Sequence, residues 1–464
     1  MGFSHDVQFW KLAHLASKKG RRRPHGVRWV VAGKSFSKWF EYDAQADNYR
    51  SQLIQAARKG EGFDTATGLP ESLAREQHAI TWYELACRFA DLKWARSAGK
   101  TRRGIADALA TVTPAMVTTR RGMPESRALR AVLYGWAFHT AHRETVTLDS
   151  SQARVLAWVR DNSVKVVALE EKEQRSEIIR RALDMLALTM DGRPAAATTI
   201  ARKRAVFYGA LNYAVELDLL AANPIDKVSW KAARVADHVD RRVVASPAQV
   251  RALLAAVETD QSELTAFFGC LYYAYLRPGE AVYLRQMDCV GLPSAGWGEL
   301  LLTGNAPHAG AQWTDAGTAR DERQLKHRAQ KATRPVPIPP ELVELIRRHM
   351  DRFAITRDGR LFRAPRGGML GESTYGRIWR EARIKALTAS QARSPLAGRP
   401  YDLRHSGVTL ALNAGVPAPE VARRAGHGVE VLLRVYAGCI EGQAPLWNRR
   451  IDDALHDDED GETP

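Results

Sequence analysis

The sequence predicts a multidomain protein that is mainly α with α+β parts. Its 464 residues exceed what one ordinary hydrophobic core accommodates, so about two to four domains are expected. Apolar side chains recur at intervals of three and four residues through most of residues 78–230, which predicts a helical domain. Two β-rich regions, residues 27–42 and 298–339, adjoin helical patterns. They predict a small sheet plus helix at the N-terminus and a mixed α/β domain towards the C-terminus.

Residues 1–75 form the predicted N-terminal domain. The stretch VRWVVAGKSFSKWFEY contains two β-rich segments that meet at Ala32-Gly33, a dipeptide suited to a tight turn. Residues 44–60 then follow helical spacing, and Gly60 ends the pattern. The basic run KKGRRR precedes the sheet. A domain of this kind is either a DNA reader or a stand-alone basic interaction domain.

Residues 78–230 form the second predicted domain, which is helical almost throughout. Its last helical pattern, TTIARKRAVFYGALNYAVELDLL, is expected to end at Pro224, because proline disrupts a helix interior. The charged residues 231–245 are predicted to be a linker. Ser246 followed by Pro247 has the form of a helix N-cap with proline at the first helical position.

Residues 246–450 form the third predicted domain. Helical patterns flank two β-rich segments, GELLLTG at residues 298–304 and TRPVPIP at residues 333–339. Residues 452–464 hold seven acidic side chains and no Lys or Arg, which is typical of a disordered tail.

The net charge favours a polyanionic partner. The formal charge is +16 at pH 7, and the acidic tail contributes −7 to it, so the other 451 residues carry +23. Such an excess favours nucleic acid, because each phosphate that is neutralised releases condensed counterions. Attraction to a membrane surface is the alternative, but the sequence has no basic amphipathic anchor, and its longest apolar run, FFGCLYYAYL, is too short to span a bilayer.

Cysteine usage and the N-terminal residues indicate a cytoplasmic protein. The four cysteines lie far apart and include no CxxC pair, which argues against a zinc site or a disulfide framework. The first residues, MGFSHDVQFWKL, contain no apolar signal region.

Two arginines of the third domain are candidates for binding an anion. Arg277, in YYAYLRPGEAVYL, precedes a helix that Pro278 can start, and Glu280 is placed to hold its side chain in one rotamer. A structural Arg–Glu pair is the alternative explanation. Arg404 lies in the helical pattern RPYDLRHSGVTLALNAG, where a single arginine is usually solvated.

A histidine and a tyrosine follow these arginines. APEVARRAGH predicts a short helix that ends at Gly426 and leaves His427 at its end. Tyr436 lies on an apolar helical face that includes Leu433, and such a face usually belongs to the core. Tyrosine is also a poor nucleophile near neutral pH, with an ordinary pKa of about 10.

Taken together, these motifs closely resemble those of the tyrosine recombinase (phage integrase) family. They are LRPGE, a lysine before TRPVPIP, YDLRH, and AGH with a tyrosine nine residues later. The specific motifs cover residues 246–440. More loosely, LNYAVELDLLAANPI is similar to the end of the family's helical core-binding domain, and VRWVVAGKSFSKWFEY with its helix is similar to the arm-type DNA-binding domain.

The resemblance implies a set of catalytic residues that act on one phosphate. Arg277 and Arg404 would grip the scissile phosphate, His427 would contact it, and Tyr436 would be the nucleophile. The complete set of catalytic residues implied by the family is Arg277, Lys326, Tyr401, Arg404, His427 and Tyr436.

Two of these positions depart from the family pattern. Tyr401 stands where the family usually has histidine; a phenol can form hydrogen bonds there but cannot become cationic near neutral pH. Lys326 would be the general acid on a β-hairpin that is longer than usual, and Lys331 is its rival.

The implied chemistry explains the residue types. Two guanidinium groups can bond phosphate oxygens bidentately and stay charged at physiological pH. Their positive field is expected to favour the phenolate form of Tyr436. Attack would leave a phosphotyrosine ester, which conserves the energy of the phosphodiester, so neither ATP, nor a metal, nor another cofactor is implied.

The implied function is that of a site-specific DNA recombinase that inserts or excises a mobile element through a 3′-phosphotyrosine intermediate. The family implies double-stranded DNA attachment sites as partners, a homo-tetramer on DNA, and a cytoplasmic, nucleoid-associated location without a membrane. The attachment sequences, and the use of an accessory directionality factor, stay open. The alternatives are a type IB topoisomerase-like enzyme that relaxes DNA and a non-catalytic DNA-binding protein on a recombinase scaffold.

Overall fold

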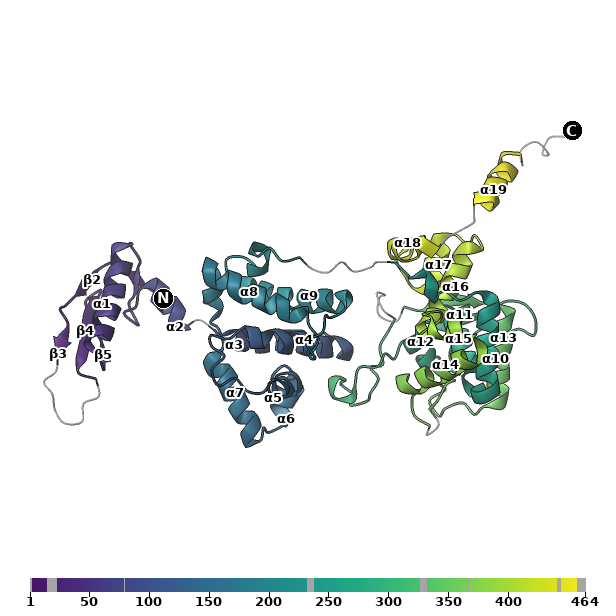
Figure 1. Cartoon of the computed structure of the whole chain (residues 1–464), viewed down its shortest axis with the longest axis horizontal. Coiled ribbons are helices and arrows are strands. Elements are labelled where there is room, and N and C mark those ends of the chain that lie inside the picture. The colour runs from purple at the N-terminus through teal and green to yellow at the C-terminus, as the bar shows by residue number, and fades with distance from the viewer. Residues whose placement is uncertain are drawn as a thin grey trace. The chain divides into compact units, whose positions relative to one another are not determined.

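The structure is a computed structural model of the chain, and it describes residues 2–14, 23–78, 80–231, 238–325, 332–364, 367–439 and 444–456. The chain divides into two compact units, one of residues 1–96 and 104–233 and the other of residues 97–103 and 234–464. Most of the described residues are helical, and the strands among them form three small sheets (Figure 1). The predicted fold class, mainly α with α+β parts, is confirmed. Within the described ranges, no helix is both long and apolar enough to cross a membrane.

The N-terminal sheet is built around β4 (His25–Val31). β5 (Lys34–Phe40) pairs along one edge of β4, while β2 (Val7–Phe9) and β3 (Ala13–His14) pair with the two ends of the other edge, all antiparallel. Ala32 and Gly33 have positive φ angles of 48° and 78°, as a two-residue hairpin turn that matches the strand twist requires. The predicted strand pair and its turn are confirmed.

The helix α1 (Asp43–Arg58) packs its apolar face on this sheet, and Gly60 follows its end with a φ of +79°. The core between them includes alternate residues of β4 and three residues of α1, namely Val27, Trp29, Val31, Ala46, Leu53 and Ala56. β1 (Phe3–Ser4) pairs with β6 (Phe63–Asp64), and α2 (Glu71–His78) follows.

Residues 80–230 are predominantly helical, as predicted. The helices are α3 (Trp82–Trp94), α4 (Gly99–Val112), α5 (Ser126–Val132), α6 (Thr140–Thr145), α7 (Ser150–Asn162), α8 (Lys172–Leu186) and α9 (Ala197–Glu216).

The predicted end of the last of these helices is wrong. α9 ends at Glu216, well before Pro224, because the chain turns at Asp218, whose φ is +56°. Pro224 instead begins a short 3₁₀ turn, Pro224–Lys227, which the Asn223 side chain caps by accepting from the backbone N–H of Ile225. The helix is therefore closed by a left-handed residue rather than by proline.

The second unit combines helices with a two-stranded sheet. Ser246 caps α10 (Pro247–Gln261), as predicted. β7 (Gly298–Leu302) and β8 (Arg334–Ile338) pair antiparallel, so both predicted β-rich segments are strands. The other helices are α11 (Thr265–Tyr273), α12 (Pro278–Tyr283), α13 (Pro340–Arg352), α14 (Glu372–Ala386), α15 (Ala389–Arg393), α16 (Tyr401–Asn413), α17 (Ala418–Ala425), α18 (Val429–Tyr436) and α19 (Ala444–His456).

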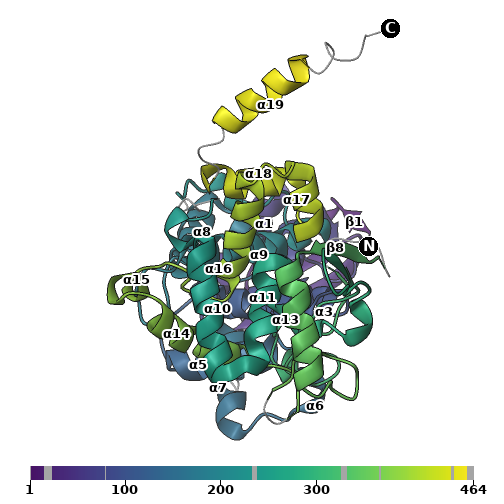
Figure 2. The ribbon, with the colours of Figure 1, turned by 90° about the vertical axis from the view of Figure 1, so that its right-hand side faces the viewer.

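The helix α11 lies in the core of this unit. It contacts α10, α13 and α16, and Figure 2 shows it between α10 and α13. The approach of α16 requires glycine at position 407, since a Cβ there would lie 2.0 Å from the carbonyl oxygen of Tyr272. This close contact brings the C-terminal end of α11 next to the first turns of α16.

Part of the predicted disordered C-terminal tail is helical, because it belongs to α19. Asp452–His456, which the sequence assigned to a disordered segment, form the end of this helix. Trp447, Ile451 and Leu455 recur every four residues and give it one apolar stripe, which continues the helical pattern into the acidic region. Residues 457–464 lie outside the described residues.

Candidate active site

Arg277 lies at the junction between α11 and α12. The chain leaves α11 through Tyr275, whose φ is +55°, and Arg277 then forms the N-cap of α12. Its guanidinium Nη1 donates to Glu280 Oε1 at 2.8 Å, and its backbone N–H donates to Glu280 Oε2 at 2.8 Å. Nη2 donates to the carbonyl oxygen of Gly426 at 2.9 Å. The expected contact with Glu280 is present and holds this arginine in one orientation.

Arg334 also binds Glu280. β8 places Arg334, Val336 and Ile338 on its buried face, so the arginine points into the unit. Its two terminal nitrogens donate to the two carboxylate oxygens of Glu280 at 3.1 and 2.9 Å. Both side chains are at most 2% exposed. Such a bidentate pair fixes the orientation of both partners.

Arg404 occupies the buried side of α16. Its side chain is 0% exposed and lies 4.0 Å from Glu280. Its Nη1 donates to the carbonyl oxygen of Tyr275, and its Nη2 donates to that of Ala425 at 2.6 Å. Arg404 is therefore not a solvated surface arginine but a fixed link between α16, α17 and the turn that follows α11.

His427 follows α17, which ends at Gly426 as predicted. Gly426 has a φ of +65°, and a Cβ there would lie 2.1 Å from Arg334 Nη1, so glycine is required. Arg404 Nη2 lies 2.6 Å from His427 Nε2. Because a guanidinium has only donors, Nε2 is the acceptor and the ring proton is on Nδ1. This Nδ1 is buried and has no hydrogen-bond partner among the described residues.

The arginines carry more charge than the carboxylate that they surround. Arg277, Arg334 and Arg404 lie within 4.0 Å of Glu280, so two positive charges of this cluster are unbalanced. Burial by itself raises the pKa of the Glu280 carboxyl, but the arginines outweigh it and lower that pKa to about 2. Burial, and then Arg404 and Arg277, lower the pKa of His427 to about 3. Near neutral pH the site thus has a charged glutamate, a neutral histidine and a net positive charge.

Tyr436 ends α18, and its side chain is 0% exposed. Its hydroxyl lies 2.9 Å from Nδ1 of His405, and its ring centroid lies 6.1 Å from that of His427. Burial raises the pKa of Tyr436 well above its ordinary value, and the charge of Arg404 only partly opposes the rise. The positive field of Arg404 and Arg277 does favour the phenolate, as predicted, but burial outweighs it, so the net shift of the Tyr436 pKa is upward.

The other predicted site residues are less closely placed. Tyr401, at the start of α16, contacts His405 edge to face, with ring centroids 5.0 Å apart. It therefore borders the site through that histidine. Lys326 and Lys331 lie outside the described residues. The structure brings together Arg277, Arg404, His427 and Tyr436.

Two residues at this site were not identified from the sequence. The sequence does contain a signal for Arg334. This arginine occupies an inward position in the alternating pattern of RPVPI, and a buried cation is unfavourable unless it is paired with an anion. His405 had none of its own, because its contact joins two helices whose packing the sequence does not specify. Burial, and to a smaller extent Arg404, lower the pKa of His405 to about 4, so it too is neutral near neutral pH.

Comparison with known sequences points to one group of proteins. No family model matches the chain. The integrase of Mycobacterium phage L5 is 30% identical over 229 residues, and that of Mycobacterium phage D29 is 27% identical over 225 residues. The resemblance to phage integrases is confirmed. Each alignment covers 48% of this chain and 54% or 53% of the integrase, so the chain spans about half the length of the curated relatives it matches.

Solved structures of integrases are also similar. The Tn1549 transposon integrase in complex with circular intermediate DNA has a TM-score of 0.45 and 16% identity, covering 68% of this chain and 97% of that one. A lambda integrase dimer bound to a COC′ core site has a TM-score of 0.46 and 12% identity, covering 87% and 89%. At these low TM-scores, the likeness carries no weight for the activity of this chain.

Proposed function

We propose that the chain is a site-specific DNA recombinase of the integrase type, which cleaves DNA by forming a covalent bond to Tyr436. The observation that carries this proposal is the convergence of Arg277, Arg404, His427 and Tyr436, which are far apart in the sequence, at one positively charged site. The sequence similarity to phage integrases supports the same function.

A phosphodiester suits the unbalanced charge of this site. Guanidinium groups bind phosphate oxygens through fixed N–H donors and stay protonated at physiological pH. His427 has an Nδ1 proton with no partner among the described residues, which is available to a non-bridging oxygen. During attack, negative charge builds on these oxygens, and one preorganised donor is worth about 3–4 kcal/mol of barrier.

The proposed reaction transfers a DNA strand to the protein. The hydroxyl oxygen of Tyr436 forms a bond to phosphorus, the bond from phosphorus to the 5′-oxygen breaks, and the 3′-phosphate stays on the tyrosine as an ester. Nδ1 of His405 is placed to accept the hydroxyl proton. Because the hydroxyl is buried without DNA, α18 must move before Tyr436 reaches a phosphate.

The departing 5′-oxygen needs a proton, and we assign its donor to Lys326, with Lys331 as the rival. A general acid of this kind is dispensable when the leaving group is a weak base. Each lysine should therefore be replaced separately and tested on DNA with a 5′-bridging sulfur at the scissile position. Only the variant that lacks the true general acid should regain cleavage on this substrate.

The rest of the chain is proposed to hold DNA and neighbouring subunits. Residues 1–75 would bind arm-type sites, and residues 78–230, with the catalytic residues 246–450, would enclose the crossover site of double-stranded DNA. A homo-tetramer would exchange strands between two attachment sites, with or without an accessory directionality factor. The apolar stripe of α19 is exposed in the isolated chain and would be covered by a neighbouring subunit.

A nicked suicide duplex tests the proposed reaction. DNA that is cross-linked to the protein in cells with formaldehyde, enriched and sequenced, provides the binding site whether or not the chain cleaves it. On a duplex with this site, the wild-type chain should form a gel-stable adduct and Tyr436→Phe should not. Tyr272→Phe is the matched control, because this buried hydroxyl has no hydrogen-bond partner among the described residues.

The burial of Tyr436 favours one second candidate, a DNA-binding protein that does not cleave. It predicts specific binding of the same duplex by the wild-type chain and Tyr436→Phe alike, with no adduct from either protein. Relaxation of supercoiled DNA without paired sites would instead indicate a topoisomerase.

A further inference from the structure

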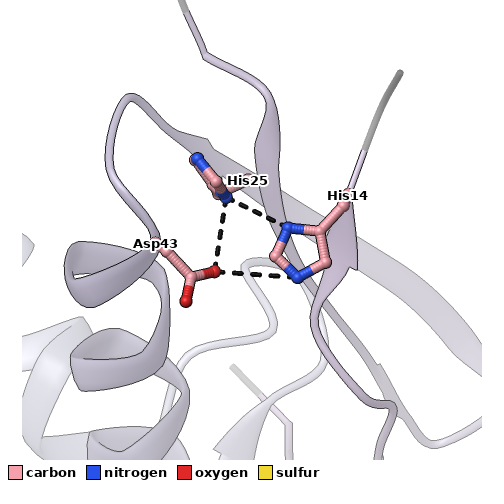
Figure 3. A group of neighbouring side chains, drawn as sticks. All are labelled: His14, His25 and Asp43. Atoms are coloured by element: carbon pink, nitrogen blue, oxygen red, sulfur yellow. Dashed lines mark hydrogen bonds and ion pairs between the residues drawn. The ribbon is translucent and has the colours of Figure 1, made fainter. Parts of the chain in front are cut away.

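His14, His25 and Asp43 come together on the surface of the N-terminal sheet (Figure 3). His14 ends β3, His25 begins β4, and the two residues are directly opposite each other in the antiparallel register. Asp43 is the first residue of α1. The two Nδ1 atoms are 3.1 Å apart, and Asp43 Oδ1 lies 3.3 Å from Nδ1 of His25 and 3.7 Å from Nε2 of His14.

Nδ1 of His25 lies where two contacts compete for one proton. Nδ1 of His25 is close to both Nδ1 of His14 and Oδ1 of Asp43. A neutral imidazole nitrogen carries at most one proton, so a single proton on Nδ1 of His25 would have to be shared between both neighbours. One shared cation would bind a single ligand atom from each group, which is one ring nitrogen of each histidine and one oxygen of Asp43.

The spacing and the chemistry of these donors fit a transition-metal ion. In a tetrahedral site with bonds of about 2.0–2.1 Å, neighbouring ligand atoms lie about 3.3 Å apart. The ligand atoms offered by His14, His25 and Asp43 all lie within 4.8 Å of one another. Two imidazole nitrogens and a carboxylate oxygen are ligands that Zn²⁺ and similar divalent ions accept.

The site is accessible and is held by regular structure. The side chains of His14, His25 and Asp43 are 59%, 24% and 58% exposed, so an ion has a direct path from solvent. The strand pairing fixes the two histidines opposite each other, and α1 supplies the carboxylate. Three protein ligands leave a fourth position for water or for a ligand from outside the chain.

We propose that His14, His25 and Asp43 form a binding site for a divalent transition-metal ion, represented by Zn²⁺. The sequence between the two histidines, LASKKGRRRP, carries five cations in ten residues. An ion bound to both histidines fixes the two ends of this basic segment at the separation that the strand register sets. The site therefore joins β3, β4 and α1 at the base of the most basic stretch of the N-terminal domain.

Metal binding by the full-length, untagged chain tests this proposal. Co²⁺ is added at micromolar protein concentration, visible absorption reports tetrahedral coordination, and Zn²⁺ is then added to displace the Co²⁺. The expected result is one site with visible bands that Zn²⁺ abolishes. His14→Ala and Asp43→Asn should each weaken the affinity at least about tenfold. Both residues are exposed, so these variants should fold, which circular dichroism checks.

His5→Ala is the matched control, since His5 is an exposed histidine of the same domain outside the cluster. This variant should bind Co²⁺ and Zn²⁺ as the wild-type chain does. Three results would overturn the proposal: no binding at micromolar concentration, binding that His14→Ala and Asp43→Asn leave unchanged, or an equal loss in His5→Ala.

Discussion

Replacing Glu280 by glutamine removes the one negative charge among the three arginines and preserves the size of the side chain. The pKa of Glu280 is lowered from 4.5 to about 2 in the folded chain, so its ionised form is stabilised by about 3 kcal/mol. Since the folded pKa lies below the unfolded one, this contribution is fully present above about pH 4.5. It is lost as the pH falls towards about 2. At pH 7, Glu280→Gln should therefore destabilise the second unit by about 3 kcal/mol.

The loss of stability is measured by hydrogen exchange in increasing urea. Mass spectrometry of peptides from α11 and α16 reports the loss in the helices next to Glu280. A local probe is needed because the two units of the chain need not unfold together. Glu430→Gln is the control, because Glu430 forms an exposed ion pair with Arg434 and should change stability little.

A loss of unfolding free energy below about 1 kcal/mol at pH 7 would refute the electrostatic reasoning, since it corresponds to a pKa shift of less than one unit. A difference between wild type and Glu280→Gln that stays constant down to pH 2 would refute it as well.

Three further perturbations test the same site. Gly426→Ala should lose about 1–2 kcal/mol from its left-handed backbone alone, whereas Gly428→Ala, whose Cβ meets no atom within 4 Å, should match wild type in the same exchange experiment. The folded pKa values of His405 and His427, about 4 and about 3, lie below the ordinary 6.5, so folding favours their neutral forms. Stability should therefore fall as the pH is lowered from about 6.5 to 4, and a rise in the stability that peptides of α16 report by exchange would contradict this. Arg404→Ala should slow single-turnover cleavage about a hundredfold or more, and full rescue by Arg404→Lys would argue against a bidentate role.

Local sequence signals predicted where several elements begin, turn and end. Ser246-Pro247 marked the start of α10, Gly426 marked the end of α17, and Ala32-Gly33 marked the hairpin turn. Each of these signals depends on the backbone preferences of one or two residues, which the sequence states directly. The end of α9 was predicted wrongly because the chain turns at Asp218 with a left-handed backbone. Aspartate does not require that conformation, so its presence in the sequence gives no clear signal.

The electrostatics of the site could not be predicted in the same way. The motif placed Arg277, Arg404, His427 and Tyr436 in one family pattern, but the sign of the pKa shift of Tyr436 depends on how completely α18 is packed. The expected phenolate followed from nearby charges alone, whereas burial contributes more.

Contacts between distant elements were the least predictable. The pairing of Arg334 with Glu280 joins a strand to a helix N-terminus, and that of His14 with His25 depends on strand register. A change of register by one residue would turn these side chains to opposite faces, and sequence spacing does not specify it.

The most direct measurement identifies the residue that becomes bound to DNA. The adduct formed on the suicide duplex is digested with nuclease and protease, and the peptide that retains a nucleotide is sequenced by mass spectrometry. We expect the nucleotide on Tyr436, in a peptide from α18, through a bond with the stability of a phosphotyrosine ester. A nucleotide on any other residue, or a wild-type chain that binds its site specifically yet never carries a nucleotide, would contradict the proposed recombinase mechanism.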